Sequence, residues 1–121
     1  MKDNSKLEMI FENMADANIL EERKISDNSV EAFLAFTPFK NSNTEVKVVK
    51  DPATSQISSE LILHDNKIAK KVNEDIFVTL AGWPTMTTMS RLNAIPNVQV
   101  QLKRGRPYLN GTPWDGEWKK V

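Results

Sequence analysis

His64 is the single histidine of this chain and the side chain best suited to acid–base catalysis. An imidazole acts as a general base near neutral pH when a carboxylate orients it, and Glu60 and Asp65 are the two acids considered for that role. The Asp65-Asn66 pair is typical of a tight turn, where an exposed polar histidine is ordinary. We therefore expect no catalytic residues and a protein that is not an enzyme.

Metal and thiol chemistry have less support still. The sequence of 121 residues holds no cysteine, which excludes disulfides, thiolate zinc sites and cysteine nucleophiles. Only an all-carboxylate site for Mg²⁺ or Ca²⁺ would remain, and the acidic residues are dispersed rather than spaced as in Asp-x-Asp or an EF-hand loop. We expect no metal and no cofactor.

Three threonines, Thr85, Thr87 and Thr88, stand at the start of a predicted helix, with Arg91 one turn further on. Backbone N–H groups at a helix start favour an anion such as phosphate, and threonine hydroxyls can add hydrogen bonds to it. The competing interpretation is helix capping, in which one threonine accepts from the backbone and the others are spacers. Both interpretations stay open, and capping is favoured.

Cations and aromatic rings alternate near the end of the chain. Exposed tryptophan, tyrosine and arginine side chains dominate protein interfaces, and the same mixture lines single-stranded nucleic-acid grooves. The formal net charge of the whole chain is zero, and Asp115 and Glu117 stand between two indoles, which disfavours phosphate. We predict a binding surface composed of Arg91, Lys103, Arg104, Arg106, Tyr108, Trp114 and Trp118.

The zero net charge hides an asymmetry between the ends of the chain. Residues 1–30 carry four basic and seven acidic side chains, whereas the segment from Pro84 onward carries six basic and two acidic ones. Such a split is typical of complementary faces in one monomer, of a self-contact, or of a surface for an acidic partner. Ordinary solvated charge is the simplest alternative.

Length and hydropathy place the chain among single-domain proteins that do not enter membranes. No apolar run approaches the roughly 20 residues that span a bilayer, and acidic residues near the start disfavour a signal peptide. We predict one domain over residues 1–121 with a flexible tail over 1–4. A capping-box pattern at Ser5 and Glu8, followed by helical spacing of apolar residues, predicts an amphipathic helix over 5–22.

The segment from Ser29 to Phe36 mixes strand-like alternation with apolar residues in the gaps, and we favour helix there. Residues 45–121 predict a sheet-bearing core, because short alternating runs are separated by turn residues. Asn110-Gly111 is the strongest hairpin signal. The predicted fold class is α+β, with an N-terminal helix, an antiparallel meander, a short inserted helix and a C-terminal hairpin. The predicted strands cover residues 45–49, 57–63, 67–72, 76–80, 98–103 and 108–109, with the helix over 85–94.

Residues 60–121 resemble small uncharacterised proteins encoded by tailed bacteriophages. The resemblance rests on the run Trp83–Asn93, which begins Trp-Pro-Thr and contains a Thr-Thr-x-x-Arg-Leu-Asn helix start, on Tyr108-Leu109-Asn110-Gly111, and on the Trp114-Asp115-Gly116-Glu117-Trp118 ending. It implies a product made in the cytoplasm of an infected bacterial host, where small non-enzymatic proteins bind host or phage components. It associates no catalytic residues with these motifs.

We therefore expect a non-enzymatic, phage-encoded accessory protein that binds a host or phage macromolecule, with inhibition of a host defence or metabolic machine as one consequence. The expected partner is a protein. The alternative is a nucleic-acid-binding protein that uses the basic aromatic C-terminal region, with affinity that falls steeply with salt. A homodimer is compatible with an amphipathic helix on a small sheet, and no membrane is expected.

Overall fold

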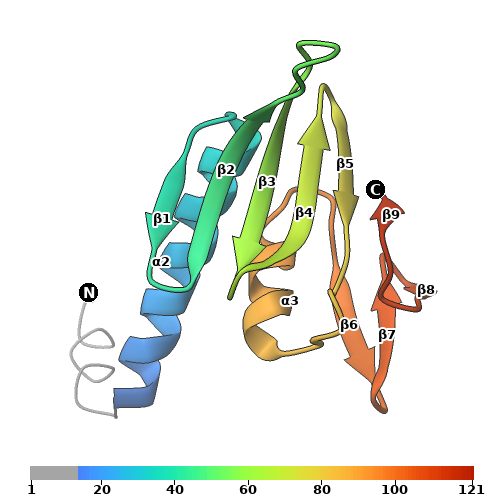
Figure 1. Cartoon of the computed structure of the whole chain (residues 1–121). Coiled ribbons are helices and arrows are strands. Elements are labelled where there is room, and N and C mark those ends of the chain that lie inside the picture. The colour runs from blue at the N-terminus through green and yellow to red at the C-terminus, as the bar shows by residue number, and fades with distance from the viewer. Residues whose placement is uncertain (1–13) are drawn as a thin grey trace.

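The computed structural model describes residues 14–121, with side chains from Arg23 onward. This part of the chain forms two helices and nine strands in two antiparallel sheets (Figure 1). The larger sheet has the order β1-β2-β3-β4-β5-β9, and the smaller has the order β6-β7-β8. The predicted α+β class is confirmed. The elements are α2 (Met14–Leu34), β1 (Phe39–Asn41), β2 (Thr44–Lys50), β3 (Ile57–Leu63), β4 (Asn66–Val72), β5 (Asp75–Val78), α3 (Met86–Asn93), β6 (Val100–Lys103), β7 (Arg106–Leu109), β8 (Thr112–Pro113) and β9 (Lys119–Lys120).

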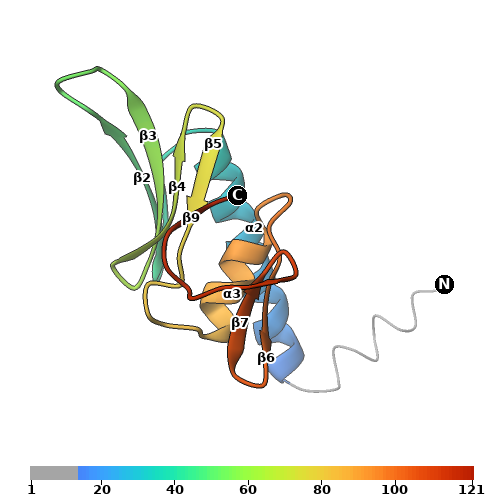
Figure 2. The ribbon, with the colours of Figure 1, turned by 90° about the vertical axis from the view of Figure 1, so that its right-hand side faces the viewer.

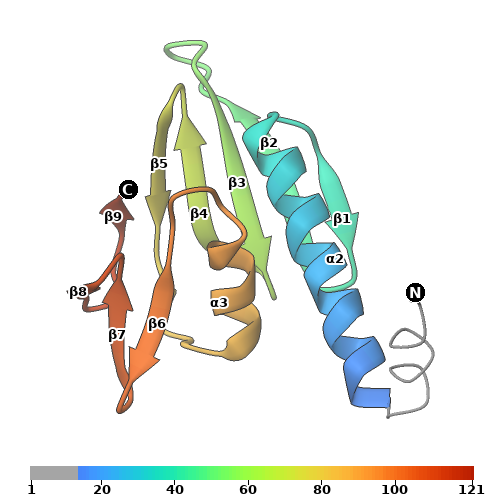
Figure 3. The ribbon, with the colours of Figure 1, turned by 180° about the vertical axis from the view of Figure 1, so that it is seen from behind.

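Both helices lie on the same side of the larger sheet (Figures 2 and 3). Helix α2 packs against β1, β2 and β3, whereas α3 packs against α2, β4 and β6. No helix or strand of residues 14–121 lies over the opposite face (Figure 2). The chain therefore has a helix layer and a sheet layer, with the small sheet attached beside α3.

Helix α2 corrects the predicted helix end. The helix expected to stop near Glu22 continues to Leu34, and the helical interpretation of residues 29–34 is confirmed. Ile25, Ser29 and Phe33 recur at intervals of four and are buried, so this face continues the helix onto the sheet. The capping box at residues 5–8 and the tail at 1–4 lie outside the described residues.

The end of α2 has its own cap from the sheet. The Leu34 carbonyl, which has no partner within the helix, accepts a hydrogen bond of 2.9 Å from Lys71 Nζ on β4. The same ammonium lies 4.9 Å from the centre of the Phe36 ring, a cation–π contact. Phe36 itself takes the left-handed backbone conformation with φ of 53°. The Phe36 N–H donates to the Phe33 carbonyl at 3.3 Å and the Thr37 N–H to the Ala32 carbonyl at 2.9 Å, which closes the last turn, and Lys71 adds a contact from the sheet.

Two predicted hairpin turns form in the structure, one at the expected residues and one shifted by a single residue. Asn110 and Gly111 have φ of 51° and 84°, as the type I′ turn predicted for this pair requires. The expected turn at Asp65-Asn66 lies one residue earlier, because β3 ends at Leu63 and His64 and Asp65 carry the positive φ values. That shift places the imidazole on the turn itself.

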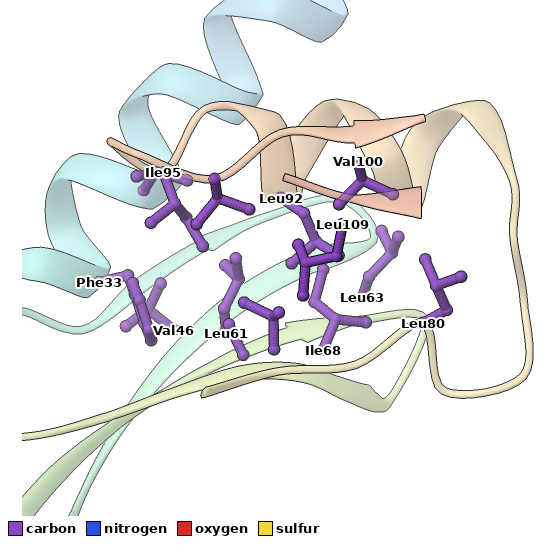
Figure 4. Packing of buried hydrophobic residues seen from close by; sticks show 14 of the residues in the cluster. Phe33, Val46, Leu61, Leu63, Ile68, Leu80, Leu92, Ile95, Val100 and Leu109 are labelled. Atoms are coloured by element: carbon purple, nitrogen blue, oxygen red, sulfur yellow. The ribbon is translucent and has the colours of Figure 1, made fainter. Parts of the chain in front are cut away.

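A single cluster of buried apolar side chains joins the helices to both sheets (Figure 4). Phe33, Leu61, Ile68 and Leu92 are at most 1% exposed, and they come from α2, β3, β4 and α3. Strands β6 and β7 add Val100 and Leu109 to the cluster, and the segment after β8 adds Trp114. Burial of this apolar surface is the main stabilising contribution and fixes the relative positions of the loops.

Candidate functional site

Arg91 is not part of an exposed surface, which corrects its predicted role in binding. Its side chain is fully buried between α3, α2 and β2. Its Nε donates to Thr44 Oγ1 at 3.0 Å, and its Nη1 donates to Ser26 Oγ at 2.7 Å. Arg91 therefore joins three elements inside the molecule and is out of reach of a partner or of an anion at the start of α3.

The two C-terminal tryptophans lie in different environments. Trp114 is 8% exposed and belongs to the core, and its Nε1 donates to the Glu117 carbonyl at 2.9 Å. Trp118 is 48% exposed and lines a hollow with Phe77 on the larger sheet. The prediction that both indoles serve one interface is therefore wrong for Trp114, whose ring is committed to packing.

The remaining cations of the predicted surface gather at the end of the β6–β7 hairpin. Lys103, Arg104 and Arg106 are exposed around a tight turn in which Arg104 has φ of 54° and Gly105 has φ of 79°. Lys103 Nζ lies 4.9 Å from the centre of the half-buried Tyr108 ring. Within residues 14–121 none of these three cations forms an ion pair. We call Lys103, Arg104 and Arg106 the basic tip.

The threonines at the start of α3 act as a cap. Thr85 is the N-cap residue, and its Oγ1 accepts from the Thr88 backbone N–H at 3.1 Å and lies 3.0 Å from Thr88 Oγ1. Thr88 is 2% exposed, whereas Thr87 is partly exposed and makes no side-chain hydrogen bond within the described part. The favoured capping interpretation accounts for Thr85 and Thr88, and anion binding stays a prediction.

His64 is held by an amide rather than by a carboxylate. Asn43 Nδ2 lies 3.3 Å from His64 Nε2, and the His64 backbone N–H donates to the Asn43 carbonyl at 2.8 Å. Neither of the acids considered in the sequence contacts the imidazole: Glu60 pairs with Lys67 Nζ at 3.2 Å, and no side-chain bond joins Asp65 to the ring within the described residues. His64 therefore lacks the orienting acid of a general base in this structure.

A chain of hydrogen bonds connects this imidazole to the buried guanidinium. Arg91 Nε donates to Thr44 Oγ1, and that hydroxyl donates to Asn43 Oδ1 at 2.8 Å. With its Oδ1 used as acceptor, the Asn43 amide points its Nδ2–H at His64 Nε2, which must then accept. The neutral imidazole consequently carries its hydrogen on Nδ1, where no protein group of residues 14–121 bonds it.

A pocket of about 370 Å³ lies beside His64, between the β3–β4 turn and the loop from β5 to α3. Its buried wall is apolar and is made by Leu63, Ile68 and Leu80, which lie at one end of the core cluster (Figure 4). Its remaining lining residues are His64, Asn66, Ala81, Trp83, Thr85 and Thr88. No lysine, arginine, aspartate or glutamate lines it.

Trp83 lines this pocket and is not among the predicted binding residues. Its indole is 61% exposed, although the loop that carries it is closely hydrogen-bonded. The Trp83 N–H donates to the Leu80 carbonyl at 2.8 Å, and the Thr85 N–H donates to the Trp83 carbonyl at 2.8 Å. An exposed tryptophan in a loop closed by backbone hydrogen bonds is a signal for binding, because tryptophan is enriched among the residues that dominate interfaces.

Two further features bear on the classes of site in the described chain. Neither helix is long and apolar enough to cross a membrane. Among residues 14–121, no group of three or more histidine, aspartate and glutamate side chains lies close enough together to hold a metal ion. The basic tip and the pocket beside Trp83 are two features of the described chain that suit recognition.

The family model described as Kyanoviridae Gp96 protein matches residues 22–120. None of the curated proteins matches this chain, and no solved structure matches it. The match begins within α2 and ends in β9, so it extends well beyond residues 60–121, on which the resemblance to phage proteins was based. The phage origin expected from that resemblance is confirmed. The chain belongs to the Kyanoviridae Gp96 protein family, a family of bacteriophage proteins.

Proposed function

We propose that this phage protein is a non-enzymatic accessory protein that docks through its basic tip onto an acidic surface of a host or phage protein. The observation that carries the proposal is the concentration of Lys103, Arg104 and Arg106 at one hairpin end without an acidic partner in the described chain. Charge placed in this way raises the rate of encounter with a surface of opposite sign and sets the register of docking. The interior of the infected bacterial cell is the proposed setting.

The geometry of the hairpin supports recognition by shape as well as by charge. Arg104 lies in the two-residue turn between the short strands β6 and β7 (Figure 1). The hydrogen-bonded hairpin therefore fixes the backbone that carries its guanidinium group. The shallow hollow beside it has a volume of about 510 Å³ and contains Arg106, Pro107 and Asp115. Planar guanidinium groups bind carboxylates with two parallel hydrogen bonds, which favours aspartate and glutamate side chains as the groups recognised.

A protein partner is preferred to a nucleic acid because of where the aromatic rings lie. A stacking platform needs several exposed rings beside the cations. Of the three rings predicted for it, Trp114 is buried, which leaves Tyr108 beside the basic tip. Trp118 lines one hollow with Phe77 and another with Thr112, and neither hollow contains a residue of the basic tip. Nucleic-acid binding is the alternative, and it would depend on phosphate contacts and hence on salt. Inhibition of a host defence or metabolic machine stays a prediction about the consequence of docking.

The test is affinity capture with two charge-reversed variants. Their positive charges are reversed at different places on the surface. The tip variant carries Lys103→Glu, Arg104→Glu and Arg106→Glu. The control variant carries the same number of charge reversals, as Lys→Glu changes at the exposed residues Lys24, Lys47 and Lys50. Both variants have the same net charge, so a general electrostatic effect would alter them equally.

Tagged wild-type, tip and control proteins are incubated with nuclease-treated bacterial lysate at low and moderate salt, and the bound proteins are identified by mass spectrometry. We expect the wild type and the control variant to retain the same protein and the tip variant to lose it. Retention of that protein by the tip variant would rule out the basic tip as the docking surface. Recovery of nucleic acid alone from untreated lysate, lost at moderate salt, would instead support the alternative.

A further inference from the structure

The pocket beside Trp83 has the composition of a binding site for a neutral molecule. Its volume of about 370 Å³ falls within the range of small-ligand pockets, which are mostly apolar with a few well-placed polar groups. Leu63, Ile68 and Leu80 make the buried wall, and each is at most 4% exposed. A lining without acidic, lysine or arginine side chains offers no counter-ion to a charged ligand, because an unpaired charge is costly to bury.

His64, one of the residues that line this pocket, brings a ring N–H to it. The chain from Arg91 through Thr44 and Asn43 makes His64 Nε2 an acceptor, so the neutral ring carries its hydrogen on Nδ1. Within the described residues no protein group uses that hydrogen. A ligand that enters the pocket with an acceptor on its edge would satisfy it.

The flat surface for such a ligand is the indole of Trp83. The loop that carries it is tied to the C-terminal segment, because Thr79 Oγ1 donates to the Gly116 carbonyl at 2.8 Å and the Leu80 N–H donates to the same oxygen at 2.9 Å. Ala81 and Gly82 follow with φ of 53° and 80°, which turns the chain sharply before the indole. A ring held by an ordered loop loses little conformational entropy on binding.

We propose that this pocket binds a neutral, planar heteroaromatic group that stacks on Trp83 and accepts a hydrogen bond from His64 Nδ1–H. Two sources share this chemistry, namely the base of a nucleoside and a free heterocyclic metabolite. The proposal uses the opposite type of recognition from the basic tip, since it depends on a donor and a ring rather than on charge. A test of this ligand site is therefore independent of a test of protein docking through the basic tip.

The test compares two nearly isosteric probes, 7-azaindole and indole, by titration into ¹⁵N-labelled full-length protein. Both have the same fused-ring shape and an N–H donor, but only 7-azaindole has a ring-nitrogen acceptor. Binding is followed by the backbone amide shifts of residues 63–68 and 80–88. Four proteins are compared: the wild type, Trp83→Ala, His64→Phe and the control Trp118→Ala, in which an exposed tryptophan outside the pocket is removed.

The two probes differ in hydrophobicity, so the decisive quantity is the change in the ratio of their dissociation constants between proteins. We expect the preference for 7-azaindole in the wild type to fall by about two- to tenfold in His64→Phe, the value of one neutral hydrogen bond. Trp83→Ala should raise the dissociation constants of both probes by a similar factor, about two- to tenfold, because it removes the surface on which each probe stacks. Trp118→Ala should change neither constant.

Three results would overturn the proposal. The first is that 7-azaindole causes no saturable amide shifts around the pocket. The second is that the ratio of the two dissociation constants is unchanged in a folded His64→Phe variant. The third is that Trp83→Ala and Trp118→Ala weaken probe binding equally. Amide spectra of each variant without probe verify that it is folded. A titration with adenosine then separates the two sources. Tighter binding of adenosine than of 7-azaindole would support a nucleoside ligand, and weaker binding would support a free heterocycle.

Discussion

Replacement of Arg91 by alanine should destabilise the protein more than replacement of any cation of the basic tip. The guanidinium is fully buried, and two of its N–H groups donate to Thr44 Oγ1 and Ser26 Oγ. A hydrogen bond to a charged group contributes about 1.5–3 kcal/mol, so the loss of two is expected to cost about 3–6 kcal/mol. Part of that cost is offset, because the Ser26 hydroxyl keeps a contact of 2.8 Å with Ser90 Oγ.

The assay is urea unfolding followed by far-ultraviolet circular dichroism, with Arg104→Ala as the matched control. Arg104 is exposed, so its replacement should change the unfolding free energy by no more than about 0.5 kcal/mol. In thermal unfolding, Arg91→Ala should lower Tm by about 10–20 °C, since about 1 kcal/mol corresponds to about 4 °C for a chain of this size. A loss below about 1 kcal/mol for Arg91→Ala would refute the reasoning.

A second substitution separates packing from hydrogen bonding. Arg91→Met keeps an unbranched apolar stem in the same space but removes every donor. If the hydrogen bonds dominate, Arg91→Met should lose most of the stability that Arg91→Ala loses. If Arg91→Met unfolds at the same urea concentration as the wild type, the guanidinium contributes little net stability, as happens when the cost of burying a charge cancels its interactions.

The remaining predictions concern stability and use the same unfolding assay. Gly116→Ala should cost about 1–3 kcal/mol, because Gly116 has φ of +83° and an added Cβ would lie 3.3 Å from Leu80 Cδ1. Trp114→Ala should cost about 3–5 kcal/mol, whereas Trp118→Ala should cost less than about 1 kcal/mol, and equal losses would contradict their different burial. Thr85→Ala should cost about 0.5–2 kcal/mol through loss of the N-cap, and a neutral effect would argue against a capping role.

Local interactions explain why much of the fold could be predicted. The Asn110-Gly111 turn and the alternation in β3 reflect backbone preferences and side-chain periodicity that neighbouring residues already specify. The end of α2 is partly local too, because Phe36 has positive φ and the Thr37 N–H donates to the Ala32 carbonyl at 2.9 Å, just before Pro38. The further contact from Lys71, whose Nζ reaches the Leu34 carbonyl from β4, could not be predicted in the same way. It comes from 37 residues away, so no pattern at the helix end itself indicates it.

The residue types available for recognition, the α+β class and the phage resemblance follow from composition, periodicity and short motifs, so the amino-acid sequence is enough to predict them. Which residues remain accessible depends on packing between elements that are distant along the chain. Arg91 and Arg104 are the same residue type, yet the first is buried where α3 packs against α2, while a hairpin turn exposes the second. His64 and Trp83 are far apart in sequence, and they line one pocket because β4 and β5 bring the two loops together.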